Sequence, residues 1–99
     1  MAETQVTVVA HVRAQLGHEA AVKQALLNLV PITLGEEGCI NFDLHEELGA
    51  LAHFVFHENW ASRALLERHL AAPHVQAFVN RAGPLLVEPP SIKVYRRVS

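Results

Sequence analysis

The sequence predicts an α+β domain with the ferredoxin-like βαββαβ order and an antiparallel sheet. Four stretches alternate between apolar and polar residues, as strands with one buried face do. Between them, apolar residues recur at helical spacing. The chain has 99 residues, the length of one small domain, so we expect residues 1–99 to form a single unit.

The first half of the chain contains two of the predicted strands and a long helix. Residues 5–14 alternate as a strand that ends before Gly17, and helical spacing follows from Val22 to Val30. Pro31 removes one backbone donor, which predicts a kink near residues 28–30, and the helix should end before Glu36. A second strand is expected over residues 39–46, followed by a turn around residues 48–50.

The second half is organised around residues 53–74, which read as one strand and one helix. The strand covers residues 53–60, and the helix runs from Ser62, a favoured N-cap residue, to Ala72. Pro73 ends this helix, and helical spacing resumes over residues 74–82. A last strand is expected over residues 92–98, after two consecutive prolines.

The strand over residues 53–60 has one face that is apolar except for a carboxylate. Alternation places four residues on this face: Phe54, Phe56, Glu58 and Trp60. The following helix has an apolar stripe that only His69 interrupts. If the helix packs on this strand face, Glu58 and His69 enter the same apolar interior, where ionisable groups are costly without partners. We therefore expect a functional site between this strand and this helix.

Each candidate site residue has a structural and a functional interpretation. Glu58 is either an end-of-strand carboxylate or a general base whose pKa is raised by burial and partly restored by His69. His69 is either a core histidine or an acid, base or hydrogen-bond donor to substrate. His74 could cap the next helical segment or line the pocket mouth. The aromatic and apolar side chains would form the core and also hold a planar ring: Trp60, Phe42, Phe54, Phe56 and Leu66.

The other histidines do not indicate a metal site. His53 and His57 share a strand face, but their separation of roughly 13 Å along the strand is too large for one ion. A polar dimer interior is the simpler explanation for them and for His11 and His45. Cys39 is the only cysteine, so no internal disulfide can form, which is usual in a reducing cytoplasm.

Composition narrows the classes of partner. Eight basic and ten acidic residues give a net charge of -2 without a basic stripe, which argues against nucleic acid and anionic membranes. No signal peptide is recognisable, and no stretch approaches the roughly 20 apolar residues of a membrane span. We expect a cytoplasmic protein. Helices on one side of the sheet leave its semi-polar face bare, so we expect a homodimer of back-to-back sheets.

Three segments of the chain resemble the antibiotic biosynthesis monooxygenase family, and within it the small bacterial quinol monooxygenase branch. These segments are TVVAHVRAQLG, LVPITLGEEGCINFDL and FVFHENWASRALLERHLAAPHVQAF. The most specific features are EEGC, the pair of Glu58 and Trp60, and the run from His69 to His74. The resemblance implies a dimeric α/β barrel of two ferredoxin-like protomers, with a pocket between sheet and helices.

The resemblance also implies oxidation of a small aromatic quinol or anthrone-like substrate by dioxygen, without flavin, haem, metal or other cofactor. A desolvated phenolate can itself reduce dioxygen, so the protein need only bind, orient and deprotonate it. Glu58 or His69 would be the base. The anthrone oxidases of the family have asparagine and tyrosine at the places of Phe56 and Leu66, and the haem-degrading relatives have tryptophan at the place of His69. Neither of those mechanisms is therefore implied.

Two alternatives stay open. The first is an isomerase or tautomerase of a small carbonyl compound, because an autoinducer-degrading relative shares the pattern of Glu58, His69 and His74. The second is a non-enzymatic ligand-binding dimer, since the fold also serves as an effector-binding module.

Overall fold

The fold is a four-stranded antiparallel sheet covered by helices on one face. The computed structural model describes residues 4–50 and 52–99. Along the chain it contains β1 (Val6–Arg13), α1 (Glu19–Leu34), β2 (Cys39–Glu46), β3 (His53–Trp60), α2 (Arg63–Leu70), α3 (Pro73–Ala82), the short 3-10 helix η1 (Gly83–Leu85) and β4 (Ser91–Tyr95). The strand order is β2-β3-β1-β4, and all neighbouring pairs are antiparallel. The predicted ferredoxin-like α+β fold is confirmed.

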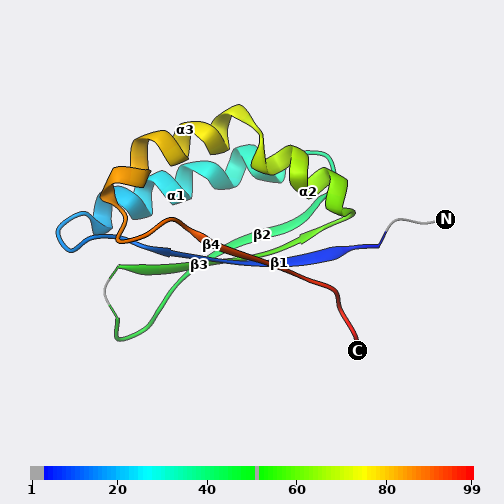
Figure 1. Cartoon of the computed structure of the whole chain (residues 1–99), viewed down its shortest axis with the longest axis horizontal. Helices are drawn as coiled ribbons and strands as arrows, with labels where there is room; N and C mark the ends of the chain where they lie inside the picture. The colour runs from blue at the N-terminus through cyan, green and yellow to red at the C-terminus, as the bar shows by residue number, and fades with distance from the viewer. Residues whose placement is uncertain (1–3, 51) are drawn as a thin grey trace.

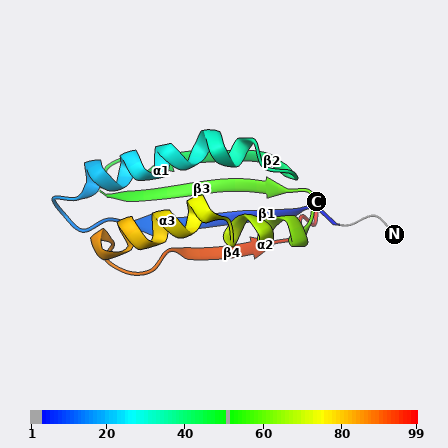
Figure 2. The ribbon, with the colours of Figure 1, turned by 90° about the horizontal axis from the view of Figure 1, so that it is seen from above.

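The helices form a single layer above the sheet (Figure 1). In the view from above, α1 lies on the side of β2 and β3, whereas α2 and α3 lie on the side of β1 and β4 (Figure 2). Because the helices share one face, the core is one apolar layer between them and the sheet. Its fully buried members include Val8, Val22, Leu26, Trp60 and Leu66.

The observed bounds match the predicted ones most closely in the central hairpin. β2 and β3 have the predicted ranges, and Ser62 caps α2 by accepting a hydrogen bond from the backbone of Leu65 at 3.2 Å. α2 ends at Leu70, two residues earlier than expected, and β4 covers Ser91–Tyr95 in place of residues 92–98. α1 continues through Pro31 to Leu34 as one helix.

A β-bulge at the start of β2 changes one predicted face. Cys39 pairs with Trp60 and Asn41 pairs with Asn59, so Ile40 is an extra residue in β2. Unbroken alternation over residues 39–46 would place Ile40 on the buried face, but its side chain is exposed, and Cys39 packs against the core instead.

The sheet face opposite the helices is largely open. His11, His45 and His57 are exposed there, as the alternation predicts. His53 on the same face is buried, because its ring stacks on His11 with centroids 5.1 Å apart and its Nδ1 lies 2.6 Å from Oε1 of Glu47. Among the described residues, no helix has the length and apolar character needed to cross a membrane.

Candidate functional site

A narrow cavity lies between the sheet and helices α2 and α3. Its free volume is about 70 Å³, less than the roughly 150 Å³ of an apolar cavity that binds benzene. Val79 on α3 and Ile92 on β4 line it and are 44% and 45% exposed, which places its mouth between these two elements. The inner walls are apolar except for Glu58 and His69, and include Leu29, Phe42, Phe56, Leu70, Val75 and Phe78.

Glu58 is buried on the helix-covered face of β3, where the alternation predicted it. Trp60, two residues further along the same face, donates its indole Nε1–H to Oε1 of Glu58 at 2.8 Å. The pKa of Glu58 is raised to about 7, mainly by burial; the Trp60 hydrogen bond lowers it, and the charge of Glu36 contributes a smaller increase. A carboxyl group with this pKa exchanges a proton readily near neutral pH.

His69 is buried on α2, with a carboxylate at one ring nitrogen. Nδ1 lies 2.9 Å from Oε2 of Glu36, so Nδ1 carries the proton and donates it when Glu36 is ionised. Burial lowers the pKa of His69, the charge and hydrogen bond of Glu36 oppose this, and His74 lowers it further. Nε2 makes no hydrogen bond to any residue that the structure describes. The neutral imidazole therefore has an accepting nitrogen available to a ligand.

Glu36 was not identified as a site residue from the sequence, and one expectation has to be corrected. We predicted that His69 would be the partner of Glu58, and that prediction is wrong. Glu36 pairs with His69, and Trp60 pairs with Glu58. The prediction that Glu58 and His69 share one interior is confirmed, because both line the cavity. The available signal was the EEGC segment, which contains Glu36.

Gly38 holds the loop that carries Glu36 against α2. Its backbone φ is +85°, and a Cβ at this position would lie 2.9 Å from Cβ of Leu65. The Gly38 carbonyl also accepts a hydrogen bond from the backbone of Ala61 at 2.8 Å. Only glycine fits this close approach without strain, and the approach brings Glu36 beside His69.

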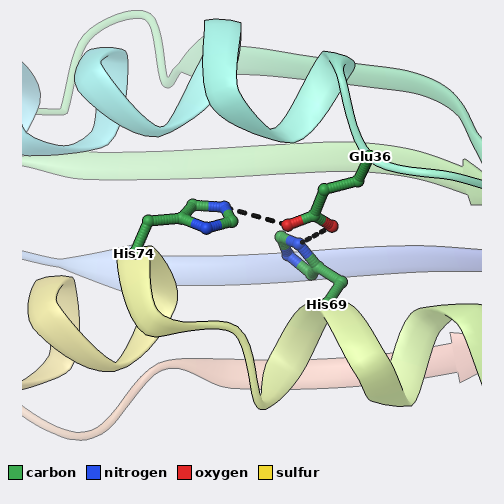
Figure 3. A group of neighbouring side chains, drawn as sticks. All are labelled: Glu36, His69 and His74. Atoms are coloured by element: carbon green, nitrogen blue, oxygen red, sulfur yellow. Dashed lines mark hydrogen bonds and ion pairs between the residues drawn. The ribbon is translucent and has the colours of Figure 1, made fainter.

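His74 lies next to the cavity wall and contacts the other oxygen of Glu36. Its Nε2 is 3.1 Å from Oε1 of Glu36 and 3.2 Å from Oγ1 of Thr33. Figure 3 shows His69 and His74 pointing from α2 and α3 toward the one carboxylate. His74 does not line the cavity, so its contact with a substrate stays a prediction.

Of the five predicted apolar site residues, two line the cavity and three do not. Phe42 and Phe56 line the cavity and stack on each other with centroids 4.2 Å apart. Trp60 is completely buried beside the cavity, with its ring 4.6 Å from that of His69 between centroids. Phe54 and Leu66 are core residues outside the cavity lining. Phe54 instead lines a surface hollow at the β2–β3 turn.

Residues 5–81 match the sequence model of a family described as antibiotic biosynthesis monooxygenase. The chain belongs to this family. The family is the one that the EEGC segment and the Glu58–Trp60 pair resemble, so the resemblance is confirmed. Membership in this family makes the protein a candidate oxidoreductase.

Several known proteins are similar to this chain over most of its length. The chain is 35% identical over 82 residues to Probable quinol monooxygenase YgiN of Escherichia coli, covering 73% of this chain and 79% of YgiN. It is 36% identical over 61 residues to a Synechocystis protein without an assigned activity, covering 62% of this chain and 42% of that protein. The solved structure of PA3566 from Pseudomonas aeruginosa has a TM-score of 0.92 at 30% identity, covering 100% of this chain and 99% of that one.

Proposed function

We propose that this protein is a monooxygenase that oxidises a small aromatic quinol or anthrone-like substrate with dioxygen, and that it needs no flavin, haem or metal for this reaction. One observation carries the proposal. A neutral imidazole held by a carboxylate and a carboxyl group with a pKa of about 7 line the same apolar cavity. The family and the name of YgiN support the reaction class.

His69 is the proposed base. Its Nε2 accepts the proton of a ring hydroxyl, while Glu36 holds the ring through Nδ1 and stabilises the imidazolium that forms. Glu58 in its protonated form is the proposed acid, and it transfers its proton to a second oxygen of the substrate. The apolar walls keep water from the phenolate, which makes the phenolate a better electron donor.

The proposed reaction needs no external reductant. A quinol and one dioxygen give a hydroxyquinone and one water, so one oxygen atom forms a C–O bond with the ring and the other leaves as water. The quinol supplies all four electrons that dioxygen takes up. The protein contributes positioning and proton transfer, which are the contributions that this cavity offers.

The cavity has to widen to admit an aromatic ring, because its free volume is about 70 Å³. The side chains that can give way are those at its mouth, on α3 and β4. Val79 and Ile92 are already half exposed there, so outward rotation of α3 side chains opens the cavity at little cost in buried area.

The open face of the sheet supports a homodimer. This face combines apolar Val9 and Val55 with the exposed histidines His11, His45 and His57, a mixture that suits a self-paired, polar interface. Sedimentation at micromolar concentration tests this assembly. A monomer under those conditions would contradict it.

The reaction is tested with metal-free protein in an oxygen electrode against hydroquinones, naphthoquinols and anthrones, with heat-denatured protein as the control for autoxidation. We expect one dioxygen consumed per substrate, and one atom of ¹⁸O₂ in the product by mass spectrometry. Substrate-dependent proton exchange without oxygen uptake would replace this proposal with isomerase or tautomerase chemistry. Binding without turnover would indicate the ligand-binding dimer.

The role of Glu58 is tested by Glu58→Gln. We expect turnover to fall by roughly 10²-fold, the usual effect of losing an acid–base group. Glu67→Gln is the matched control, since Glu67 is exposed on α2 and does not line the cavity. Equal rates in Glu58→Gln and the parent would remove Glu58 from the mechanism.

A further inference from the structure

Three potential metal ligands converge where α2, α3 and the α1–β2 loop meet. Glu36, His69 and His74 each offer one ligand atom, and these atoms all lie within 4.8 Å of one another. Figure 3 shows that the three side chains come from three different elements and point to a common centre. Folded proteins often build metal sites from residues on separate elements. The spacing of these three residues in the sequence does not indicate that they meet.

The carboxylate at this centre is incompletely paired. Oε2 of Glu36 accepts from His69, but Oε1 is buried and has no hydrogen-bond partner among the described residues. Oε1 lies 3.1 Å from Nε2 of His74, in a direction that does not make a hydrogen bond. That nitrogen is also within 3.2 Å of Oγ1 of Thr33, whose hydroxyl can donate to it. A buried oxygen facing an imidazole nitrogen in this way is stabilised by a cation placed between them.

We propose that Glu36, His69 and His74 bind one divalent transition-metal ion of the zinc class. Two imidazole nitrogens and one carboxylate oxygen are ligands that Zn²⁺, Co²⁺ and Fe²⁺ accept, whereas Mg²⁺ and Ca²⁺ prefer oxygen alone. Ligands in a tetrahedral zinc site lie about 3.4 Å apart at the usual bond lengths. The observed contacts of 2.9 and 3.1 Å join the two histidines to the two different oxygens of Glu36. One ligand atom from each residue lies within 4.8 Å of the others, so rotation of the side chains brings the three ligands to the spacing of a zinc site.

An ion can reach this site without passing through the apolar cavity. A surface hollow of about 250 Å³ lies on the outer side of the cluster and is lined by Glu36, Glu37, Leu65, Arg68, His69 and Ala72. Arg68 at its rim lies 3.5 Å from Glu37, so its charge is offset and does not close the hollow to cations. The metal site and the proposed substrate cavity therefore share His69 but open in different directions.

If the proposed function is correct, the ion inhibits it. Coordination through Nδ1 requires the proton of His69 to be on Nε2, and this tautomer cannot accept a proton from a substrate. Coordination also takes Glu36 away from its hydrogen bond. Metal binding and general-base catalysis by His69 are thus mutually exclusive, and the site makes the enzyme sensitive to zinc-class ions. This consequence rests on the proposed function, but the binding itself does not.

The binding test uses Co²⁺, whose visible absorption reports its ligands and geometry, and needs no substrate. Metal-free protein titrated with Co²⁺ should show one equivalent bound per chain, with absorption typical of a four- or five-coordinate ion, and Zn²⁺ should displace it. Glu36→Gln, His69→Ala and His74→Ala should each weaken binding at least roughly 10-fold. Zn²⁺ should raise the unfolding temperature of the parent and not that of His74→Ala.

Matched controls locate the ion. His18→Ala removes an exposed histidine outside the cluster and should leave binding unchanged. His11→Ala removes the partner of His53, which forms a second histidine contact at 2.9 Å on the opposite sheet face. Binding lost in His11→Ala but kept in His74→Ala would overturn the proposal, as would parent protein that binds no Co²⁺ at micromolar concentration. Circular dichroism of each variant separates loss of binding from loss of fold.

Discussion

Nδ1 of His69 lies 2.9 Å from Oε2 of Glu36, across 33 positions of sequence. This contact determines what His69 can do. An ionised carboxylate at Nδ1 holds the proton on that nitrogen and leaves Nε2 as the acceptor. It also stabilises the imidazolium that forms when Nε2 takes a proton. The loop that carries Glu36 is therefore part of the candidate site, although it does not line the apolar cavity.

Glu36→Gln should lower turnover by roughly 10²-fold with little change in KM, because the amide can occupy the same place but cannot stabilise an imidazolium. Oxygen uptake under saturating quinol measures this change. ¹⁵N NMR of the His69 ring gives a second readout, since the fraction of the Nδ1–H tautomer should fall. Glu37→Gln is the neighbouring control, because Glu37 is exposed and, among the residues that the structure describes, its ion pair is with Arg68. A similar loss in both variants would contradict a specific role for Glu36.

Glu58 should make the stability of the fold dependent on pH. Burial raises its pKa from an ordinary value of 4.5 to about 7 in the folded state, so the folded protein holds this proton more tightly than the unfolded chain does. The resulting stabilisation is complete below about pH 4.5 and is lost as pH rises through about 7.

Glu58→Gln removes this dependence, since glutamine does not ionise. The free energy of unfolding of Glu58→Gln relative to the parent should rise between pH 4.5 and 8, by at most about 3 kcal/mol. Urea unfolding at several pH values measures it, with Glu67→Gln as the exposed-carboxylate control. If the difference in free energy of unfolding between Glu58→Gln and the parent stays constant with pH, burial does not raise the pKa of Glu58.

Gly38→Ala should destabilise the protein more than Gly17→Ala does. Both glycines have positive φ, +85° and +92°, so both substitutions carry a backbone cost of roughly 1–2 kcal/mol. Only at Gly38 does the new Cβ meet a side chain, that of Leu65, which adds roughly 1–3 kcal/mol. Urea unfolding compares the two variants. Equal losses would mean that Leu65 moves aside freely and that the loop does not depend on this contact.

Val75→Ala should shift substrate preference toward larger rings. Val75 lines the cavity, and removing two methyl groups there enlarges a space that is smaller than an aromatic ring. The ratio of kcat/KM for a naphthoquinol to that for a monocyclic hydroquinone should rise by roughly 10-fold. Val87→Ala is the control, because Val87 is 63% exposed. An unchanged ratio in Val75→Ala would indicate that the rings do not bind in this cavity.

Local patterns in the sequence predicted much of this fold and part of its site. The ranges of β2 and β3, the Ser62 cap and the burial of Glu58 on the face of Trp60 follow from alternation and capping, which involve residues a few positions apart. The meeting of Glu58 and His69 in one interior follows from two such patterns combined. The same reasoning did not find the bulge at Ile40, because only Cys39 precedes it in β2, which is too short a stretch for the alternation to show a change of phase.

The partners of the ionisable groups were decided by tertiary structure alone. Glu36 reaches His69 and His74 because Gly38 lets the α1–β2 loop pack on Leu65, and no periodicity links a loop to a helix some 30 residues away. The width of the cavity was likewise beyond the sequence, since it depends on how α3 side chains such as Val75 and Phe78 settle against the sheet. The pattern of apolar residues in the sequence determined the layers of this protein. The close packing between those layers determined which carboxylate each histidine meets.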